Sequence, residues 1–492
     1  MNASVSRWSA FVIVFLSLLT GRTTSVVAER IDDRPNIIWV FCDDMGWADL
    51  GANGSVDDAK TPNLDDLAER GVRFTSGTIT APQCSPSRAG LLTGRYQQRF
   101  GFGHIGLGPL PLSEITIAER LADAGYATGM IGKWHLEPNA ATPDFNRERT
   151  GDPKRVPPPE EFLRYFPEQR GFTDVYKGEI QQYRRTYRLN GQDLPEGAGP
   201  IQTVQHPGYR LTTQTQAALA FITRHRDQPF FLYLAYFAPH VPLEATPELL
   251  MRFPGPMAER RRHALAMNAA MDDGVGAIVK RLETLGLADN TMIVFLSDNG
   301  APIKITKEDR TLEWKGGAWD GSINDPLNGE KGTILEGGIR VPFVMAWPGQ
   351  IPGGQVVDEP ISSLDLAATS MAMAGLEPAE TMDGVDLLPS LVDGEPIVER
   401  DLFWRFWGQS AVRRGDWKLL VLATGERYLF NLADDPSEQH NLASEHPDRV
   451  DRLYRSLESW AGQLEPAGLP SGNLNDQEQK FYEAFLGRPI DR

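Results

Sequence analysis

The chain has 492 residues with a formal net charge of −17, and 41% of its residues are hydrophobic. This length provides for about two to three globular domains with enough core to fold without disulfides. The acidic balance argues against nucleic acid and against anionic membrane surfaces as partners.

The first element is an apolar run over residues 8–20, preceded by Arg7. Val26-Val27-Ala28 offers small residues where a signal peptidase would cleave. The pattern predicts a secretory signal peptide over residues 1–28, and the run is too short for a membrane span. We therefore expect an exported protein, periplasmic or secreted, with no membrane attachment after cleavage.

Strand and helix patterns then alternate along residues 29–390, which we predict to be the N-terminal catalytic domain. Apolar runs predict strands over 36–42, 127–131, 230–237, 291–296 and 341–346. Periodic patterns predict helices over 61–70, 85–95, 115–124, 211–224 and 262–285. This alternation predicts an α/β fold with a large, mostly parallel sheet sandwiched by helices. Ligands bind such sheets at the carboxyl ends of the strands.

Residues 391–492 predict a smaller C-terminal α+β domain and tail. Segments 411–419 and 428–432 flank a short turn-rich gap, as the two strands of a hairpin would. An amphipathic helix near 447–464 completes an antiparallel sheet with one helix, and little pattern follows Pro466.

The segment Cys84-Ser85-Pro86-Ser87-Arg88, followed by Ala89 to Arg95, is the most informative motif. Pro86 suits a first helical turn, so Cys84 lies at or near the N-cap. Free N–H groups and the helix dipole there face an incoming anion, and Arg88 lies one turn later on the same face. The alternative is an ordinary buried cysteine before a helix. The motif resembles the signature of the sulfatase family, formylglycine-dependent enzymes of the alkaline phosphatase superfamily.

The resemblance implies that a maturation enzyme oxidises Cys84 to formylglycine. Its hydrated form attacks the sulfur of a sulfate ester with one hydroxyl and later expels the sulfate with the other. The only other cysteine is Cys42, so we expect no disulfide. The likeness runs from Arg34 to about Leu442 and is weakest over residues 136–210.

Oxygen-bearing side chains follow two predicted strands. Asp43-Asp44 comes directly after the first strand, and Asp298-Asn299 comes after the strand at 291–296. Carboxylate and amide oxygens suit a hard cation, Ca²⁺ or Mg²⁺. Either pair alone would be read as a polar strand end. The resemblance implies one Ca²⁺ per chain, less readily Mg²⁺, held by Asp43, Asp44, Asp298, Asn299 and the modified Cys84.

Basic residues also lie at predicted strand ends. Lys133 and His135 belong to Gly132-Lys133-Trp134-His135, His240 follows Pro239, and Lys331 precedes the strand at 341–346. Singly, each would be a solvated loop residue. The resemblance implies that Arg88 stabilises the diol alkoxide and that Lys133, Lys331 and His240 bind the sulfate oxygens. It also implies that His240, with Lys331, protonates the leaving alcohol and that His135 deprotonates the second hydroxyl.

Residues 136–210 are rich in Arg, Tyr, Pro and Gly. We interpret them as long surface loops, with a rim of the substrate pocket as the alternative, since aromatic rings stack on sugars and Arg pairs with acidic groups. Trp404, Phe406 and Trp407 are further candidates for this rim, and so is His104, although a plain loop histidine is the simpler interpretation.

The predicted activity is hydrolysis of a small-molecule or oligosaccharide sulfate ester, and we expect a sulfated carbohydrate attacked at a chain end. Two alternatives stay open. One is an aryl sulfate or phosphoester hydrolase of the same superfamily, although the eight histidines form no cluster typical of two zinc ions. The other is a catalytically dead homologue that only binds carbohydrate.

Overall fold

The computed structural model describes residues 32–140, 142–314 and 317–487. The predicted signal peptide at 1–28 lies outside these residues. Within the described ranges, no helix combines the length and the apolar character that a membrane crossing requires.

A ten-stranded sheet forms the centre of the molecule, in the order β11-β2-β10-β9-β1-β8-β4-β5-β6-β7. Its four middle strands are β9 (Thr291–Ser297), β1 (Asn36–Asp43), β8 (Phe230–Pro239) and β4 (Ala127–Gly132). Each of these pairs in parallel with its neighbour, which confirms the predicted parallel sheet. All their residues are buried, as expected for strands covered on both faces.

The two edges of the sheet are mixed. On one side, β10 (Phe343–Ala346) is antiparallel to both β9 and β2 (Val72–Phe74), and β11 (Gln355–Val357) is parallel to β2. On the other side, β5 (Asp174–Lys177) is parallel to β4, and β6 (Gln182–Arg185) and β7 (Gln202–Gln205) continue antiparallel.

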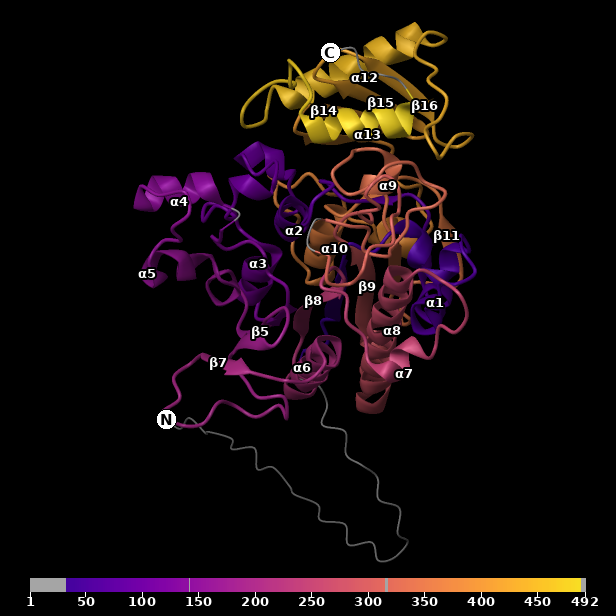
Figure 1. The fold of residues 1–492 in the computed structure, drawn as a ribbon. Helices are drawn as coiled ribbons and strands as arrows, with labels where there is room; N and C mark the ends of the chain where they lie inside the picture. The colour runs from indigo at the N-terminus through magenta and orange to yellow at the C-terminus, as the bar shows by residue number, and fades with distance from the viewer. Residues whose placement is uncertain (1–31, 141, 315–316, 488–492) are drawn as a thin grey trace, which may run out of the picture.

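The region 136–210 is therefore more ordered than the predicted surface loops. It supplies three edge strands as well as the short helices α4 (Pro143–Thr150) and α5 (Pro159–Phe162). Three tyrosines of this region, Tyr176, Tyr183 and Tyr187, are fully buried in the core, and their burial stabilises these edge strands. These strands and helices lie at one side of the molecule (Figure 1).

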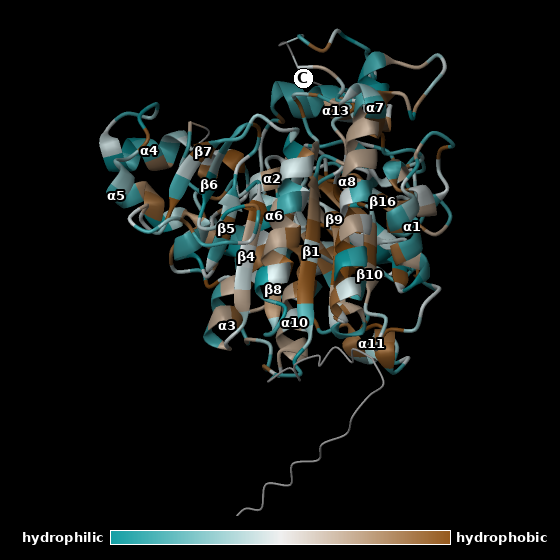
Figure 2. Cartoon of the chain, turned by 90° about the horizontal axis from the view of Figure 1, so that it is seen from below, coloured by the Kyte–Doolittle hydropathy of each residue, from teal (hydrophilic) through white to brown (hydrophobic). Residues whose placement is uncertain are grey.

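Helices cover both faces of the sheet. Along β1, Ile37, Trp39 and Phe41 point to one core, and Ile38 and Val40 point to the other. The first core includes α2 (Cys84–Thr93), α3 (Ile117–Asp123) and α10 (Asp365–Met373), and the second includes α1 (Pro62–Glu69), α6 (Arg210–Arg224) and α8 (Glu259–Leu285). Figure 2 shows the apolar central strands behind helices such as α6 and α8, which carry both hydrophilic and hydrophobic residues.

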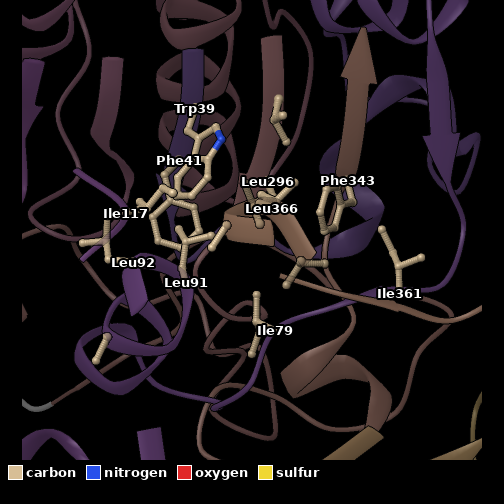
Figure 3. Close-up of a cluster of buried hydrophobic side chains, with 14 of the residues drawn as sticks. Trp39, Phe41, Ile79, Leu91, Leu92, Ile117, Leu296, Phe343, Ile361 and Leu366 are labelled. Carbon is tan, nitrogen blue, oxygen red and sulfur yellow. The ribbon is translucent and has the colours of Figure 1, made fainter. Parts of the chain in front are cut away.

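The helix that carries Cys84 packs directly on the sheet. Leu91 and Leu92 contact the same core as Trp39 and Phe41 (Figure 3). All ten residues of α2 are buried. The remaining short elements are β3 (Gly77–Thr78), β12 (Ile361–Ser362), α7 (Pro247–Leu250), α9 (Glu336–Ile339) and α11 (Leu388–Val392).

A separate four-stranded antiparallel sheet follows, made of β13 (Asp401–Phe406), β14 (Gln409–Arg414), β15 (Trp417–Leu422) and β16 (Arg427–Asn431). The prediction of a small α+β unit is confirmed, and β15 and β16 form the predicted hairpin around the turn-rich gap; only the assignment of 411–419 to a single strand was wrong. Segment 411–419 is itself a hairpin, because Gly415 at a φ of 56° turns the chain between β14 and β15. The domain boundary near residue 390 stays a prediction.

Two helices accompany this sheet, α12 (Pro447–Ala461) and α13 (Asp476–Leu486). The second was not predicted. Its start is marked by a capping box in which Asn475 and Glu478 satisfy each other's backbone N–H groups. In Figure 1 both helices lie with the small sheet at one end of the molecule, above α2 and α9.

The small sheet is tied to the catalytic core. The indole of Trp404 donates to the carbonyl of Ile79 (2.7 Å), and the side chain of Gln409 donates to the carbonyl of Gly332 (3.0 Å). Trp404 and Phe406 are buried in the core shared with α2. These two residues are therefore structural, and the suggestion that they line a substrate pocket was wrong.

Candidate active site

Four adjacent parallel strands place the predicted residues at one edge of the sheet. Asp43 ends β1, Asp298 follows β9, His240 follows β8, and Lys133 follows β4. Because these strands are neighbours, their carboxyl ends converge. The chain turns sharply here, and Asp44 has a φ of 70°, a left-handed conformation typical of functional sites.

The carboxylates lie within metal-binding distance of one another. Ligand atoms of Asp43, Asp298 and Cys84 all lie within 4.8 Å, and so do those of Asp43, Asp44 and His240. The backbone N–H of Asp44 donates to Asp298 Oδ1 (3.1 Å), which fixes the two strand ends together.

Two buried oxygen atoms of this cluster are free to bind a cation. Within the described ranges, Asp43 Oδ1 and Asn299 Oδ1 are buried and accept no hydrogen bond. Burial and the neighbouring Asp43 raise the pKa of Asp298 well above its ordinary value. A buried group of carboxylates with orphaned oxygens favours an added positive charge. The carboxylate and amide oxygens of these residues, which lie beside position 84, are donors that fit a hard divalent cation.

Cys84 is the first residue of α2, and the residue is 3% exposed. The Lys331 ammonium lies 3.8 Å from its Sγ. Gly332, next to Lys331, donates its N–H to the carbonyl of Pro82 (2.9 Å), so this segment is held beside the start of α2. The helix N-terminus, with a lysine in front of it, is suited to an anion.

Arg88 is fully buried behind Cys84. Its guanidinium donates to Asp298 Oδ2 (2.6 and 3.2 Å), to the carbonyl of Lys133 (3.0 Å) and to the hydroxyl of Tyr233 (3.3 Å). Asp43 Oδ1 lies 3.7 Å away. Arg88 therefore joins α2 to three strand ends. Sequence reasoning missed Tyr233, because it lies within an apolar strand that carries no polar motif.

Two lysines face the carboxylates. Lys133 Nζ lies 2.6 Å from Asp43 Oδ2, and Lys331 Nζ lies 2.5 Å from Asp44 Oδ1. Burial alone would raise the pKa of Asp43, but Lys133 and His240 hold that pKa well below its ordinary value. Burial opposes the charge of both ammonium groups, but the neighbouring carboxylates raise the pKa of Lys133 and of Lys331 above the ordinary value, so both stay charged.

The two histidines differ in their surroundings. His240 Nδ1 lies 2.6 Å from the carbonyl of Val241, and Nε2 lies 3.7 Å from Asp44 Oδ2. His135 has a φ of 59°, and its carbonyl accepts a hydrogen bond from the hydroxyl of Ser85. Burial lowers the pKa of His240 to about 4 and that of His135 to about 3. Both imidazoles are neutral at pH 7.

Arg210 holds the backbone that carries His240. This arginine is 1% exposed, and its Nη2 donates to the carbonyls of His240 (3.3 Å) and Pro242. Its guanidinium also lies 4.6 Å from the Phe237 ring centre. Only a tertiary contact reveals this role, since Arg210 begins α6, far from His240 in sequence.

A cavity of about 670 Å³ opens onto this cluster. It exposes Asp44, His240 and Lys331, and its outer wall comes from the segment between β9 and α9. The wall residues were not predicted, because this segment has no helix or strand pattern. They include Lys304, Leu312, Trp314 and Asp320.

His104 and Trp407 lie elsewhere. Their rings are 6.5 Å apart, and they line a different cavity of about 330 Å³ next to residues 465–470. Within the described part of the chain, neither residue lines the cavity above Lys331. His104 Nδ1 accepts a hydrogen bond from the N–H of Gly106 (3.2 Å), as a loop histidine would.

A parallel sheet that gathers carboxylates, cations and a helix N-terminus at its carboxyl edge forms a site suited to an anionic ligand. Residues 35–376 match the family model described as Sulfatase, and residues 329–461 match that of the C-terminal part of N-sulphoglucosamine sulphohydrolase. The chain belongs to the sulfatase family and is a sulfuric ester hydrolase.

Relatives with known activities agree with this assignment. N-acetylgalactosamine-6-sulfatase of Mus musculus is 35% identical, with 94% of this chain and 92% of the relative aligned. Arylsulfatase A of Homo sapiens is 32% identical, with 92% of each chain aligned.

Solved structures share the fold. The crystal structure of Ps i-CgsB in complex with k-i-k-neocarrahexaose is 29% identical, with a TM-score of 0.72 over 92% of this chain and 97% of that one. The phosphonate monoester hydrolase of Agrobacterium radiobacter is 24% identical with a TM-score of 0.60, over 88% of this chain and 96% of that one, a likeness of fold alone.

Proposed function

We propose that this enzyme removes sulfate from a carbohydrate, using a formylglycine made from Cys84 and one bound Ca²⁺. The observation that carries the proposal is the position of Cys84. It lies at a helix N-terminus, within 4.8 Å of the ligand atoms of Asp43 and Asp298 and 3.8 Å from Lys331 Nζ.

The Cys84 thiol stands where the formylglycine side chain would be. The aldehyde hydrate supplies the attacking oxygen, and the divalent cation supplies Lewis acidity toward a sulfate oxygen. Asp43, Asp44, Asp298 and Asn299 would hold the cation, with position 84 as a further ligand. The orphaned oxygens Asp43 Oδ1 and Asn299 Oδ1 support this ligand set.

The cationic side chains then bind the ester. Lys133 pairs with Asp43 and Lys331 pairs with Asp44, and we assign both ammonium groups to the sulfate oxygens in front of Cys84. Fixed charges in a buried site stabilise developing negative charge more strongly than they would in water. Arg88 holds Asp298 and the carbonyl of Lys133 in place and adds its own charge behind position 84.

The histidines move protons. His240 faces the cavity and is placed to give a proton to the departing sugar oxygen. Its imidazole is neutral in the empty cavity, but a bound sulfate ester brings a negative charge that raises the imidazole pKa. We assign His135 the role of accepting a proton from the group at position 84; its imidazole is neutral, and its backbone carbonyl accepts a hydrogen bond from Ser85, the residue after Cys84.

The names of the relatives support a carbohydrate as the substrate. The murine relative is an N-acetylgalactosamine-6-sulfatase, and the similar crystal structure holds a neocarrahexaose. Export through the predicted signal peptide would bring the enzyme to sulfated polysaccharides and their fragments. A maturation enzyme that converts Cys84 is the protein partner this mechanism requires.

The test is turnover on a panel of substrates, with the mass of the peptide containing residue 84 measured on the same preparation. We expect a mass for formylglycine, turnover of one or more sulfated sugars, and loss of all turnover in Cys84→Ala. Full activity with an unmodified thiol would disprove the mechanism. Faster hydrolysis of phosphate esters would favour the phosphoester alternative, and a converted enzyme that binds sugars without turnover would favour the dead homologue.

A further inference from the structure

One side chain on the outer wall of the catalytic cavity has no role in the mechanism above. Trp314 is 49% exposed, and every other Phe, Tyr and Trp in the described part of the chain is buried or half-buried. It lines the cavity that also contains Asp44, His240 and Lys331. An indole that is exposed at a cavity offers a large flat apolar face to a ligand.

The segment that carries Trp314 is anchored at its base. Arg260, which is 2% exposed, donates to the carbonyls of Arg310 (2.7 Å), Thr311 (2.7 Å) and Trp319 (3.0 Å). The carboxylate of Asp309 accepts the first free N–H groups of α8, from Glu259 (3.1 Å) and Arg260 (3.3 Å). These bonds fix both sides of the segment to the start of α8.

The indole is also held in orientation. The Arg310 guanidinium lies 4.9 Å from the Trp314 ring centre, a cation–π contact that occupies part of the ring. The backbone N–H of Trp314 donates to the carbonyl of Thr311 (3.0 Å), which closes a turn and positions the residue that carries the ring. A ring that is oriented before a ligand arrives loses less entropy on binding.

We propose that Trp314 is the specificity-determining platform of the cavity, on which the sugar ring that bears the scissile sulfate stacks. This inference rests on the proposed carbohydrate substrate. A pyranose has an apolar face of C–H groups, which suits an indole, and polar edges, which suit the exposed Lys304 and Glu313 on the same wall. The sulfate then points inward to Lys331 and His240.

The experiment compares Trp314→Ala and Trp314→Phe with the wild type on two substrates, N-acetylgalactosamine 6-sulfate and methyl sulfate, which has no ring. For the sugar, kcat/KM should fall about tenfold in Trp314→Ala, mostly through KM, and recover largely in Trp314→Phe. For methyl sulfate, kcat/KM should change by less than about twofold. The matched control is Trp417→Ala, another tryptophan with an arginine on its ring (4.1 Å to Arg449) but outside the cavity.

Two outcomes would overturn the platform. Unchanged sugar turnover in Trp314→Ala would show that the ring makes no contact, and an equal loss for methyl sulfate would show that Trp314 only supports the cavity. Binding separates this inference from the catalytic proposal. In the Cys84→Ala background, calorimetry should show that Trp314→Ala weakens binding of N-acetylgalactosamine 6-sulfate about tenfold, whether or not the wild type turns over.

Discussion

Removal and return of calcium should change the stability of this protein by an amount that the site predicts. Asp43 and Asp298 are fully buried, and Asp43 Oδ1 and Asn299 Oδ1 lack hydrogen-bond partners within the described ranges. An ion that binds only the folded state at a free concentration of 100 times its Kd adds about 2.7 kcal/mol of stability. Unfolding entropy of about 2.1 cal/mol/K per residue gives this 492-residue chain roughly 1 kcal/mol per kelvin, so Tm should rise by about 3 °C.

The assay is calorimetric or dye-monitored unfolding of chelator-treated protein, titrated with Ca²⁺, Mg²⁺ or Zn²⁺. Asn299→Ala removes one ligand oxygen and should reduce the shift at the same Ca²⁺ concentration to below about 1 °C. The matched control is Asn268→Ala, since Asn268 is also buried (2% exposed) with both amide atoms unpartnered, but lies on α8 outside the carboxylate cluster. An undiminished shift in Asn299→Ala, no shift in the wild type, or two zinc ions per chain by elemental analysis would refute the proposed site.

Three further predictions concern the framework around the site. Arg210→Met should lower kcat/KM at least tenfold, with little change in secondary structure by circular dichroism, because the backbone of His240 loses a hydrogen bond that holds it. The control is Arg281→Met, which loses a hydrogen bond to Thr223 far from the site. Equal activities of the two variants would contradict the anchoring role of Arg210. In urea unfolding, Gly300→Ala should destabilise the fold by about 3 kcal/mol or more, because the added Cβ would lie 1.8 Å from the carbonyl oxygen of Gly337. The control is Gly103→Ala, whose added Cβ meets no atom within 4 Å, and it should leave the free energy of unfolding unchanged. Burial raises the pKa of Glu438 from 4.5 to about 7. Because the folded-state pKa exceeds the unfolded-state pKa, the free energy of unfolding should fall as the pH rises between these two values. Tm measured over this pH range should fall less steeply in Glu438→Gln than in the wild type, and identical slopes would disprove the assignment.

The sequence predicted the central strands and the residues at their ends well. The strands β1, β8 and β9 are continuous apolar runs, and a polar group directly after such a run has to emerge at the sheet edge. That rule located Asp43, Asp298 and His240 without any knowledge of their contacts.

Other parts of the structure depend on contacts that no local pattern records. The edge strands β5 to β7 are short and half polar, so they resemble loops until Tyr176 and Tyr183 are seen in the core. Likewise, the segment with Trp314 has no periodicity, and Arg210 and Arg260 act on backbone carbonyls far away in sequence. The capping box at Asn475 was available in the sequence and was overlooked.

The burial of α2 would limit the time available for the proposed maturation of Cys84. Cys84 is 3% exposed, and the helix around it is covered by the large sheet on one side and approached by the small sheet through Trp404 and Gln409. If Cys84 is converted as proposed, the converting enzyme would have to reach this segment before those contacts form. The last strand of the small sheet ends at Asn431, so roughly 350 residues are synthesised after Cys84, which takes about 20 to 70 s at usual elongation rates. Under the proposed mechanism, conversion of Cys84 would compete with folding, because the folded chain leaves residue 84 only 3% exposed.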